Sequence, residues 1–315
     1  MLYPCIMMIG LHPSVCLHYT WEQNKPVPNT HDESPEALAE DRKTRYSQNQ
    51  GKFNLFLQLG GDDIQSIHRI GYDEPEECTT PCGLELPWNI PEIPFNAFAA
   101  KEVMDLGAGD AFRIYRQYLQ LLTWQTAERK RGDFTWMLKC PFHLPYLNEL
   151  TEAFPDATIV WTHRDPVECI ASACSLYETI MHWVMVPESV NKVALGKAVM
   201  NYTRYALDKA FETLDRIGTS MKVVHVRYAD NVKNPKDICR LVSETAGLGF
   251  SPEYENRIDV YLAKNAEERA KLKAEKAASG EKLHEYTLEE YGLSKEIVRE
   301  RFADYTAKYR LVKEG

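Results

Sequence analysis

The run at residues 157–163 constrains the fold of this chain most strongly. It is apolar and rich in β-branched residues, and it is too short to form a helix of its own. It stops at Arg164-Asp165-Pro166, where Asp165 can cap a following helix and Pro166 suits the first helical turn, whose N–H groups lack partners anyway. The pattern predicts a buried parallel strand that leads directly into a helix.

Arg164 falls at the C-terminal end of this predicted strand. Ligands of open α/β sheets bind at that edge, and a helix N-terminus beside it favours an anion. Ser172 follows on the same helix, roughly 10 Å beyond Asp165 at about 1.5 Å per residue, within the span of a long arginine. One phosphate can then contact both side chains. The alternative is a helix cap with a solvated surface charge.

A second predicted strand covers 134–139 and ends at Lys139, with a helix at 143–153 after it. Farther along, a long helix at 187–216 precedes a strand at 222–227, and Asn234-Pro235 opens another helix. This alternation predicts an α/β fold with a mostly parallel sheet flanked by helices.

Other segments read as helices or loops. Ser34-Pro35 starts a helix, and the helix at 110–130 buries a core face made of Phe112, Tyr115, Leu119 and Leu122. The proline-rich stretch 73–98 is a loop. The final helix, 294–309, packs Ile297, Phe302 and Tyr305 inward.

Composition bounds the class of protein. The 315 residues are 44% hydrophobic, which is enough for one domain over 1–315, with an irregular N-terminal segment at 1–33 and a charged insertion at 263–283. The net charge of -9 argues against nucleic acid and against an anionic membrane surface as partners. Eight cysteines without a C-x-x-C pair favour a reducing compartment. Without a leader or spanning segment, we expect a cytoplasmic protein.

Two stretches in order carry a resemblance to a known family. They are Leu138-Lys139-Cys140-Pro141-Phe142-His143 and the segment 154–166, which reads F-P-D-A-T-I-V-W-T-H-R-D-P and is followed by Ser172. The chain resembles the PAPS-dependent sulfotransferases of the bacterial type and, more distantly, the tyrosylprotein sulfotransferases, which share L-K-x-P-x-H and F-P-x-A-x-I-V-x-T-H-R-D-P. The similarity covers nearly the whole chain.

The resemblance implies a P-loop-NTPase-like sulfotransferase fold. It also implies transfer of a sulfuryl group from 3′-phosphoadenosine 5′-phosphosulfate (PAPS) to a hydroxyl or amine, without a metal. By the same likeness, Arg164 and Ser172 hold the 3′-phosphate, Tyr228 lies near the adenine, and Lys139 neutralises charge on the reacting group. These residue types suit the roles, because the planar guanidinium of an arginine matches the geometry of a phosphate and the compact ammonium of a lysine matches a developing point charge.

The acceptor hydroxyl needs a base, and the family uses a histidine or a glutamate. His143 and Glu22 are the two candidates. The alternative for His143 is a locally hydrogen-bonded histidine at a helix start, and for Glu22 a solvated loop carboxylate. Both readings stay open. A lysine of the charged insertion, such as Lys264 or Lys282, is a further candidate for the 3′-phosphate, although a solvated helix explains that segment better.

The chain departs from the family pattern in one respect. The family opens with a strand and a loop of the type P-R-[ST]-G-[ST]-[ST], whose backbone N–H groups cradle the 5′-phosphosulfate. This sequence has no such loop, and Gly107-Ala108-Gly109-Asp110 reads as a loop between helices. We expect the family's first strand and loop to precede Met1, unless the product has lost catalytic competence.

Three functions follow. The first is a sulfotransferase for a small hydroxylated acceptor, with a homodimer possible. The second is an inactive homologue that binds adenosine 3′,5′-bisphosphate or a partner protein. The third, a P-loop kinase of small molecules, is disfavoured because the sequence lacks G-x-x-x-x-G-K.

Overall fold

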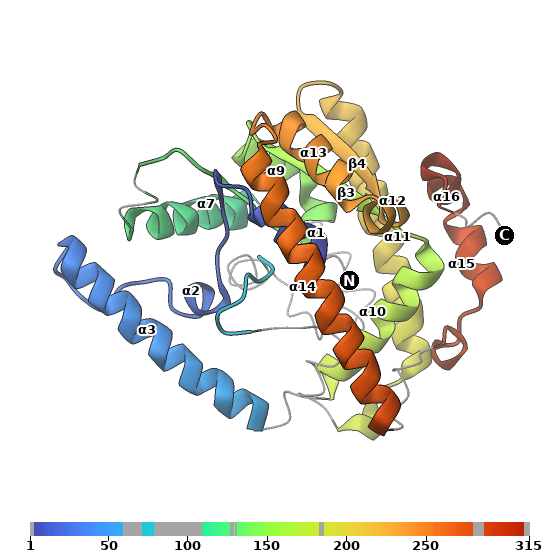
Figure 1. Cartoon of the computed structure of the whole chain (residues 1–315). Coiled ribbons are helices and arrows are strands. Elements are labelled where there is room, and N and C mark those ends of the chain that lie inside the picture. Colours follow the sequence, from blue (N-terminus) through green and yellow to red (C-terminus); the bar gives the residue numbers. More distant parts are fainter. Residues whose placement is uncertain are drawn as a thin grey trace.

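A computed structural model describes residues 3–58, 71–78, 109–126, 129, 131–182, 186–279 and 287–311, with only the backbone at 3–6, 272–273 and 275–279. Figure 1 shows helices gathered around short strands, with the long helix α14 (Pro252–Ser279) crossing the front of the view. No helix in these ranges combines the length and the apolar character needed to span a bilayer.

The described strands form two parallel pairs. Strand β3 (Thr158–His163) pairs with β4 (Lys222–Arg227), so that His163 lies opposite Arg227 at the C-terminal end. Strand β1 (Val15–Cys16) pairs with β2 (Thr135–Trp136). The predicted parallel pairing and the strands at 157–163 and 222–227 are confirmed. The strand predicted at 134–139 is shorter, because its partner β1 ends at Cys16.

Two long helices form the largest core with β3. Helix α10 (Pro166–Met181) begins as predicted: the Asp165 carboxylate accepts a hydrogen bond of 2.9 Å from the backbone N of Val167. Helix α11 (Lys192–Ile217) packs against it, preceded by the 3-10 turn η3 (Pro187–Ser189) where one continuous helix was predicted. Their shared core contains Trp161, Ile170 and Leu195.

The segment after Lys139 forms a 3-10 helix before the α-helix. The turn η2 (Pro141–Tyr146) precedes α9 (Leu147–Ala153), whereas the sequence predicted one helix at 143–153. Pro145 accounts for the difference, because it lacks the N–H that an α-helix needs there. Helix α7 (Gly109–Trp124) covers this segment, and its four predicted core residues are buried.

The prediction of an irregular N-terminal segment at 1–33 is wrong for residues 3–24. It contains α1 (Tyr3–Gly10), β1 and α2 (Thr20–Asn24), and Met8 and Ile9 pack against Val224 and Val226 of β4. Helix α3 (Pro35–Phe56) starts where Ser34 predicted, since the Ser34 hydroxyl accepts a hydrogen bond of 3.3 Å from the backbone N of Ala37. The predicted loop beyond residue 78 and residues 107–108 lie outside the described ranges.

Short helices follow β4. They are α12 (Tyr228–Lys233), α13 (Pro235–Ala246), the 3-10 turn η4 (Glu289–Tyr291), α15 (Lys295–Arg301) and α16 (Ala303–Tyr309).

The final helix, predicted as continuous at 294–309, is interrupted at Phe302 between α15 and α16. Phe302 and Tyr305 are buried as predicted, but the prediction for Ile297 was wrong, because its side chain is 47% exposed. Val298 takes its place in the core, since a spacing of four residues from Phe302 keeps both on one helix face and a spacing of five does not.

Candidate functional site

The ends of two neighbouring strands bring the first two predicted site residues together. Arg164 follows β3 and Tyr228 follows β4, and the last residues of these strands, His163 and Arg227, are register partners. The guanidinium carbon of Arg164 lies 4.7 Å from the centre of the Tyr228 ring. A cation over an aromatic face at this distance is attracted by the ring quadrupole. The parallel register thus places a positive charge and a flat aromatic surface at one edge of the sheet.

Glu168 on the first turn of α10 orients Arg164. Its carboxylate oxygen Oε2 accepts from Nε of Arg164 at 2.9 Å and lies 2.8 Å from Nη2. The Arg164 side chain is 25% exposed, so it is open to solvent as well as held. Ser172 lies four residues beyond Glu168 on the same helix and is partly exposed. Residues at this spacing share a helix face, so Ser172 projects on the side where Glu168 meets Arg164.

Lys139 follows β2 at the other strand pair. It forms an ion pair with Glu77, and its carbonyl oxygen accepts a hydrogen bond of 2.8 Å from the backbone N of Cys78. Burial lowers the pKa of Lys139 to about 8, although the nearby Cys140 and Glu76 oppose this fall. The amine is therefore less strongly protonated near neutral pH than an exposed lysine.

His143 lies in η2, four residues after Lys139. Its Nε2 atom is buried and has no hydrogen-bond partner among the residues that the structure describes. The ring is surrounded by aromatic groups, with ring centres 5.8 Å from Phe112 and 6.3 Å from Tyr115. Burial lowers the pKa of His143 to about 3, and the positive charges of Lys139 and His18 add to this effect. The imidazole is therefore neutral near pH 7.

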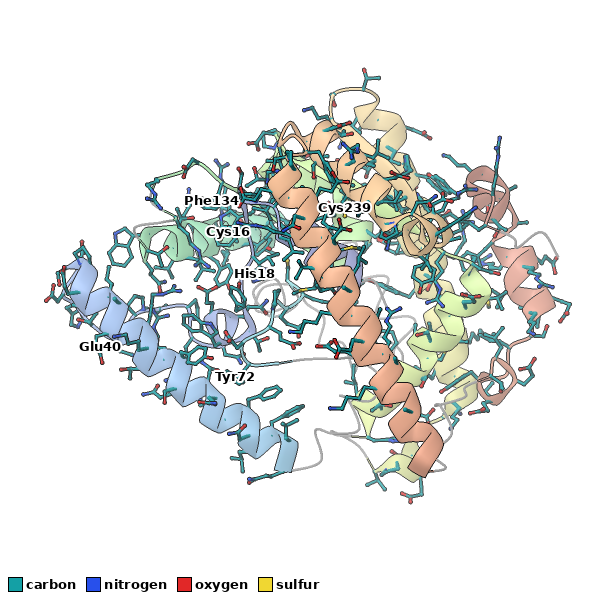
Figure 2. All side chains as sticks on the ribbon, in the orientation of Figure 1. Cys16, His18, Glu40, Tyr72, Phe134 and Cys239 are labelled. Carbon is teal, nitrogen blue, oxygen red and sulfur yellow. The ribbon has the colours of Figure 1, made fainter. Side chains whose placement is uncertain are left out.

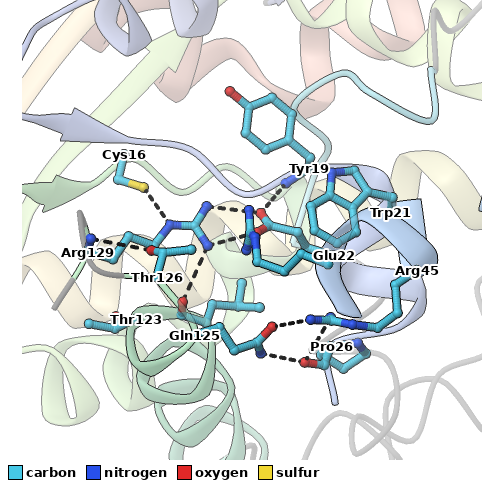
Figure 3. Close-up of polar contacts among 12 residues, drawn as sticks. Cys16, Tyr19, Trp21, Glu22, Pro26, Arg45, Thr123, Gln125, Thr126 and Arg129 are labelled. Atoms are coloured by element: carbon cyan, nitrogen blue, oxygen red, sulfur yellow. Dashed lines mark hydrogen bonds and ion pairs between the residues drawn. The ribbon is translucent and has the colours of Figure 1, made fainter. Parts of the chain in front are cut away.

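Glu22, the other candidate base, lies in α2 within a buried ion-pair cluster (Figure 3). Its side chain is 0% exposed, and Oε1 lies 2.7 Å from Nη1 of Arg129 and 3.1 Å from Nη1 of Arg42. Oε2 accepts from Nη2 of Arg129 at 3.1 Å and from the backbone N of Tyr19 at 3.2 Å. Burial alone would raise the pKa of Glu22, but the two arginines lower it. Glu22 is therefore not the solvated loop carboxylate that one reading of the sequence described.

A second buried network lies beside this cluster and was missed in the sequence. Cys78 Sγ accepts a hydrogen bond of 2.8 Å from the Tyr115 hydroxyl and lies 3.4 Å from Nε2 of His18. His18 is 2% exposed, and Figure 2 shows it and Cys16 away from Glu40 on helix α3. Cys78 and His18 lie 60 residues apart with no periodic pattern linking them, so local sequence could not predict this contact.

The charged segment is helical as far as it is described. In α14, Lys264 is 74% exposed and lies 3.9 Å from Glu268, which agrees with the reading as a solvated helix. Lys282 lies outside the described residues.

Comparison with known proteins places these features in a family. The profile described as "Sulfotransferase family" matches residues 7–252. The omega-hydroxy-beta-dihydromenaquinone-9 sulfotransferase Stf3 of Mycobacterium bovis is 26% identical over 208 residues, which are 64% of this chain and 51% of the relative. Stf3 of Mycobacterium tuberculosis matches to the same extent. The chain therefore spans about half the length of the curated relatives it matches.

Solved structures show the same fold. The sulfotransferase STF9 from Mycobacterium avium has a TM-score of 0.76 at 23% identity, covering 100% of this chain and 75% of that one. STF1 from Mycobacterium tuberculosis has a TM-score of 0.70 at 21% identity, covering 96% and 73% respectively. The sequence motifs, the α/β fold with parallel strands and the profile match agree, and the chain belongs to the sulfotransferase family.

Proposed function

We propose that this chain binds PAPS and transfers its sulfuryl group to a hydroxyl of a small, largely apolar acceptor. The proposal depends above all on the placement of Arg164 over the Tyr228 ring at the shared end of β3 and β4. Adenine and a 3′-phosphate need a flat apolar surface and a nearby cation, and these two side chains supply both.

The donors at this edge suit the 3′-phosphate. A guanidinium has five N–H donors, so the bonds from Nε and Nη2 of Arg164 to Glu168 leave others for a phosphate. The Ser172 hydroxyl adds a donor on the same face of α10. The N-terminal end of α10 contributes a favourable dipole, because negative charge is stabilised near the first turn of a helix.

Lys139 has the electrostatic role in this proposal. Sulfuryl transfer resembles phosphoryl transfer, in which catalysis depends mainly on positioning and on positive charge where negative charge develops. The ammonium of Lys139 provides that charge at the oxygen that leaves the sulfur. Glu77 holds this side chain through their ion pair, which fixes the position of the ammonium group.

His143 is the better candidate for the base. Its unpartnered Nε2 can accept the proton of the acceptor hydroxyl, whereas the carboxylate of Glu22 is engaged by Arg129 and Arg42. A negative sulfuryl group nearby would raise the pKa of His143 and so strengthen it as a base. The aromatic rings of Phe112 and Tyr115 around it favour an apolar acceptor. The relative Stf3 is an omega-hydroxy-beta-dihydromenaquinone-9 sulfotransferase, which supports a hydroxylated acceptor for this chain.

Nucleotide binding tests the cofactor site directly. Calorimetry should show that adenosine 3′,5′-bisphosphate binds more tightly than adenosine 5′-monophosphate or ATP. Arg164→Ala should weaken the bisphosphate at least tenfold, since one charge-assisted hydrogen bond contributes about 1.5–3 kcal/mol. The matched variant Glu168→Gln keeps the guanidinium and removes a nearby negative charge, so its affinity should equal or exceed that of the wild type.

Equal affinity of the folded Arg164→Ala protein and the wild type would contradict the site. Tighter binding of ATP than of the bisphosphate would favour the hypothesis of a P-loop kinase. The hypothesis of an inactive homologue predicts the same binding results as the hypothesis of an active enzyme. A transfer assay with a labelled sulfuryl donor separates them, because only an active enzyme transfers the label to an apolar alcohol.

A further inference from the structure

A tyrosine of the C-terminal helix contacts the end of β3 next to Arg164. The Tyr305 hydroxyl of α16 lies 3.1 Å from Nδ1 of His163, the last residue of β3. His163 is 0% exposed and directly precedes Arg164. The contact joins residues 142 positions apart in the sequence. It connects the C-terminal part of the chain to the strand end that presents the phosphate-binding arginine.

The His163 imidazole is fixed on its other sides as well. Its Nε2 lies 2.9 Å from Nδ1 of His225 on β4. The ring of Tyr309 stacks on it, with centres 3.6 Å apart and planes 14° from parallel. Burial lowers the pKa of His163 to about 3, and His225 and Lys308 add to the fall. The ring is therefore neutral, and each of its nitrogens has a defined partner.

The Tyr305 hydroxyl remains protonated and can donate a hydrogen bond. Burial raises the pKa of Tyr305 and Cys169 adds to this rise, whereas the backbone N–H of Arg164 lowers it. In the tautomer in which Nε2–H of the neutral His163 donates to Nδ1 of His225, Nδ1 of His163 accepts the proton of the Tyr305 hydroxyl.

Helix α16 is itself anchored, so it can act as a fixed support. Phe302, immediately before the helix, is 0% exposed in the core. Asp304 in the first turn of α16 accepts a hydrogen bond of 2.7 Å from Arg204 of α11. Figure 1 shows α15 and α16 at the edge of the molecule, with the C-terminus beside them.

We propose that Tyr305 is a positioning residue: its hydroxyl fixes the backbone at the end of β3 and so sets the direction in which Arg164 extends toward the 3′-phosphate. This inference rests on the proposed function. The guanidinium is at the end of a long side chain, so a small rotation of the Arg164 backbone displaces it far more than it displaces the strand. Tyr305 therefore affects recognition of the 3′-phosphate without contacting the nucleotide.

Helix α16 provides a matched control. The Tyr309 hydroxyl is buried without a hydrogen-bond partner among the residues that the structure describes, and its ring packs on the same imidazole. Tyr305→Phe and Tyr309→Phe each remove one buried oxygen from one helix and keep the ring. Only the first removes a hydrogen bond to His163.

The test is the ratio of the affinities for adenosine 3′,5′-bisphosphate and adenosine 5′-monophosphate, measured by calorimetry on the full chain. We expect Tyr305→Phe to lower this ratio on the order of tenfold, through weaker bisphosphate binding alone. Tyr309→Phe should keep the wild-type ratio. A general loss of structure would weaken both nucleotides and leave the ratio unchanged, so the ratio separates positioning from simple destabilisation.

A wild-type ratio in Tyr305→Phe, or an equal fall in Tyr309→Phe, would overturn the inference. A wild type that does not prefer the bisphosphate would instead refute the proposed function, so the two failures are distinguishable. If Tyr305→Phe does not fold, the variants His163→Asn and His163→Leu test the effect of the same hydrogen bond on the affinity ratio without altering α16. Asn keeps a polar atom near the position of Nδ1 and should retain the ratio, whereas Leu should lower it, and equal ratios in the two would also overturn the inference.

Discussion

Replacing Glu22 by glutamine separates a structural from a catalytic role for this carboxylate. The side chain is 0% exposed and meets two arginines, one of which, Arg129, is itself only 10% exposed. Removing one partner of a buried ion pair costs about 3–5 kcal/mol, because the remaining charge stays buried without compensation. Glutamine keeps one acceptor for an arginine N–H, so we expect the lower end of this range, about 3 kcal/mol.

That loss should be visible in thermal unfolding. With an unfolding entropy of about 2.1 cal/mol/K per residue, a loss of about 3 kcal/mol lowers the Tm of a chain of this length by roughly 4–5 °C. The control is Glu40→Gln, because Glu40 is 72% exposed and its pair with Lys43 lies on the surface. Surface pairs of this kind contribute at most about 1 kcal/mol, so the Tm of this control should hardly move.

The pH dependence of the difference has a definite sign. The pKa of Glu22 is lower in the folded protein, so its ionised form stabilises the fold above the unfolded pKa of about 4.3. This contribution is lost as the pH falls through the folded pKa. The Tm difference between wild type and Glu22→Gln should therefore be full at pH 7 and shrink in acid. An unchanged Tm at pH 7, with turnover reduced by two or more orders of magnitude, would refute the structural reading and identify Glu22 as the base.

Two further predictions concern Lys139 and the packing of α11. Turnover should fall as the pH rises through about 8, because Lys139 then loses its proton, and a pH–rate profile of Lys139→Arg should lack this decline since arginine stays charged. A decline of equal steepness in both proteins would contradict the assignment. A Cβ at Gly196 would overlap the carbonyl oxygen of Tyr291, so Gly196→Ala should destabilise the fold by about 1–3 kcal/mol in denaturant titrations. Gly51→Ala, on an open part of α3, should stabilise it by about 0.5–1 kcal/mol, and equal effects at the two positions would refute the overlap.

Much of the site was readable from local sequence. The apolar run before Arg164 predicted β3, and Asp165-Pro166 predicted the start of α10, because strand periodicity and helix capping depend on neighbouring residues alone. The same holds for the buried face of α7. The order of Lys139, Arg164 and Ser172 carried the family resemblance, and the profile match confirmed the family.

The contacts that give these residues their environment came only from the tertiary structure. Glu22 meets Arg129 across 107 residues, and Tyr305 meets His163 across 142, with no periodic pattern linking either pair. Local sequence fixes which residues form a strand or cap a helix, because those preferences act over a few residues. Among the described residues, packing of distant elements decides which carboxylate is neutralised by arginines, which histidine nitrogen is unpartnered and which tyrosine contacts the end of β3, since burial and partner choice are properties of the assembled fold.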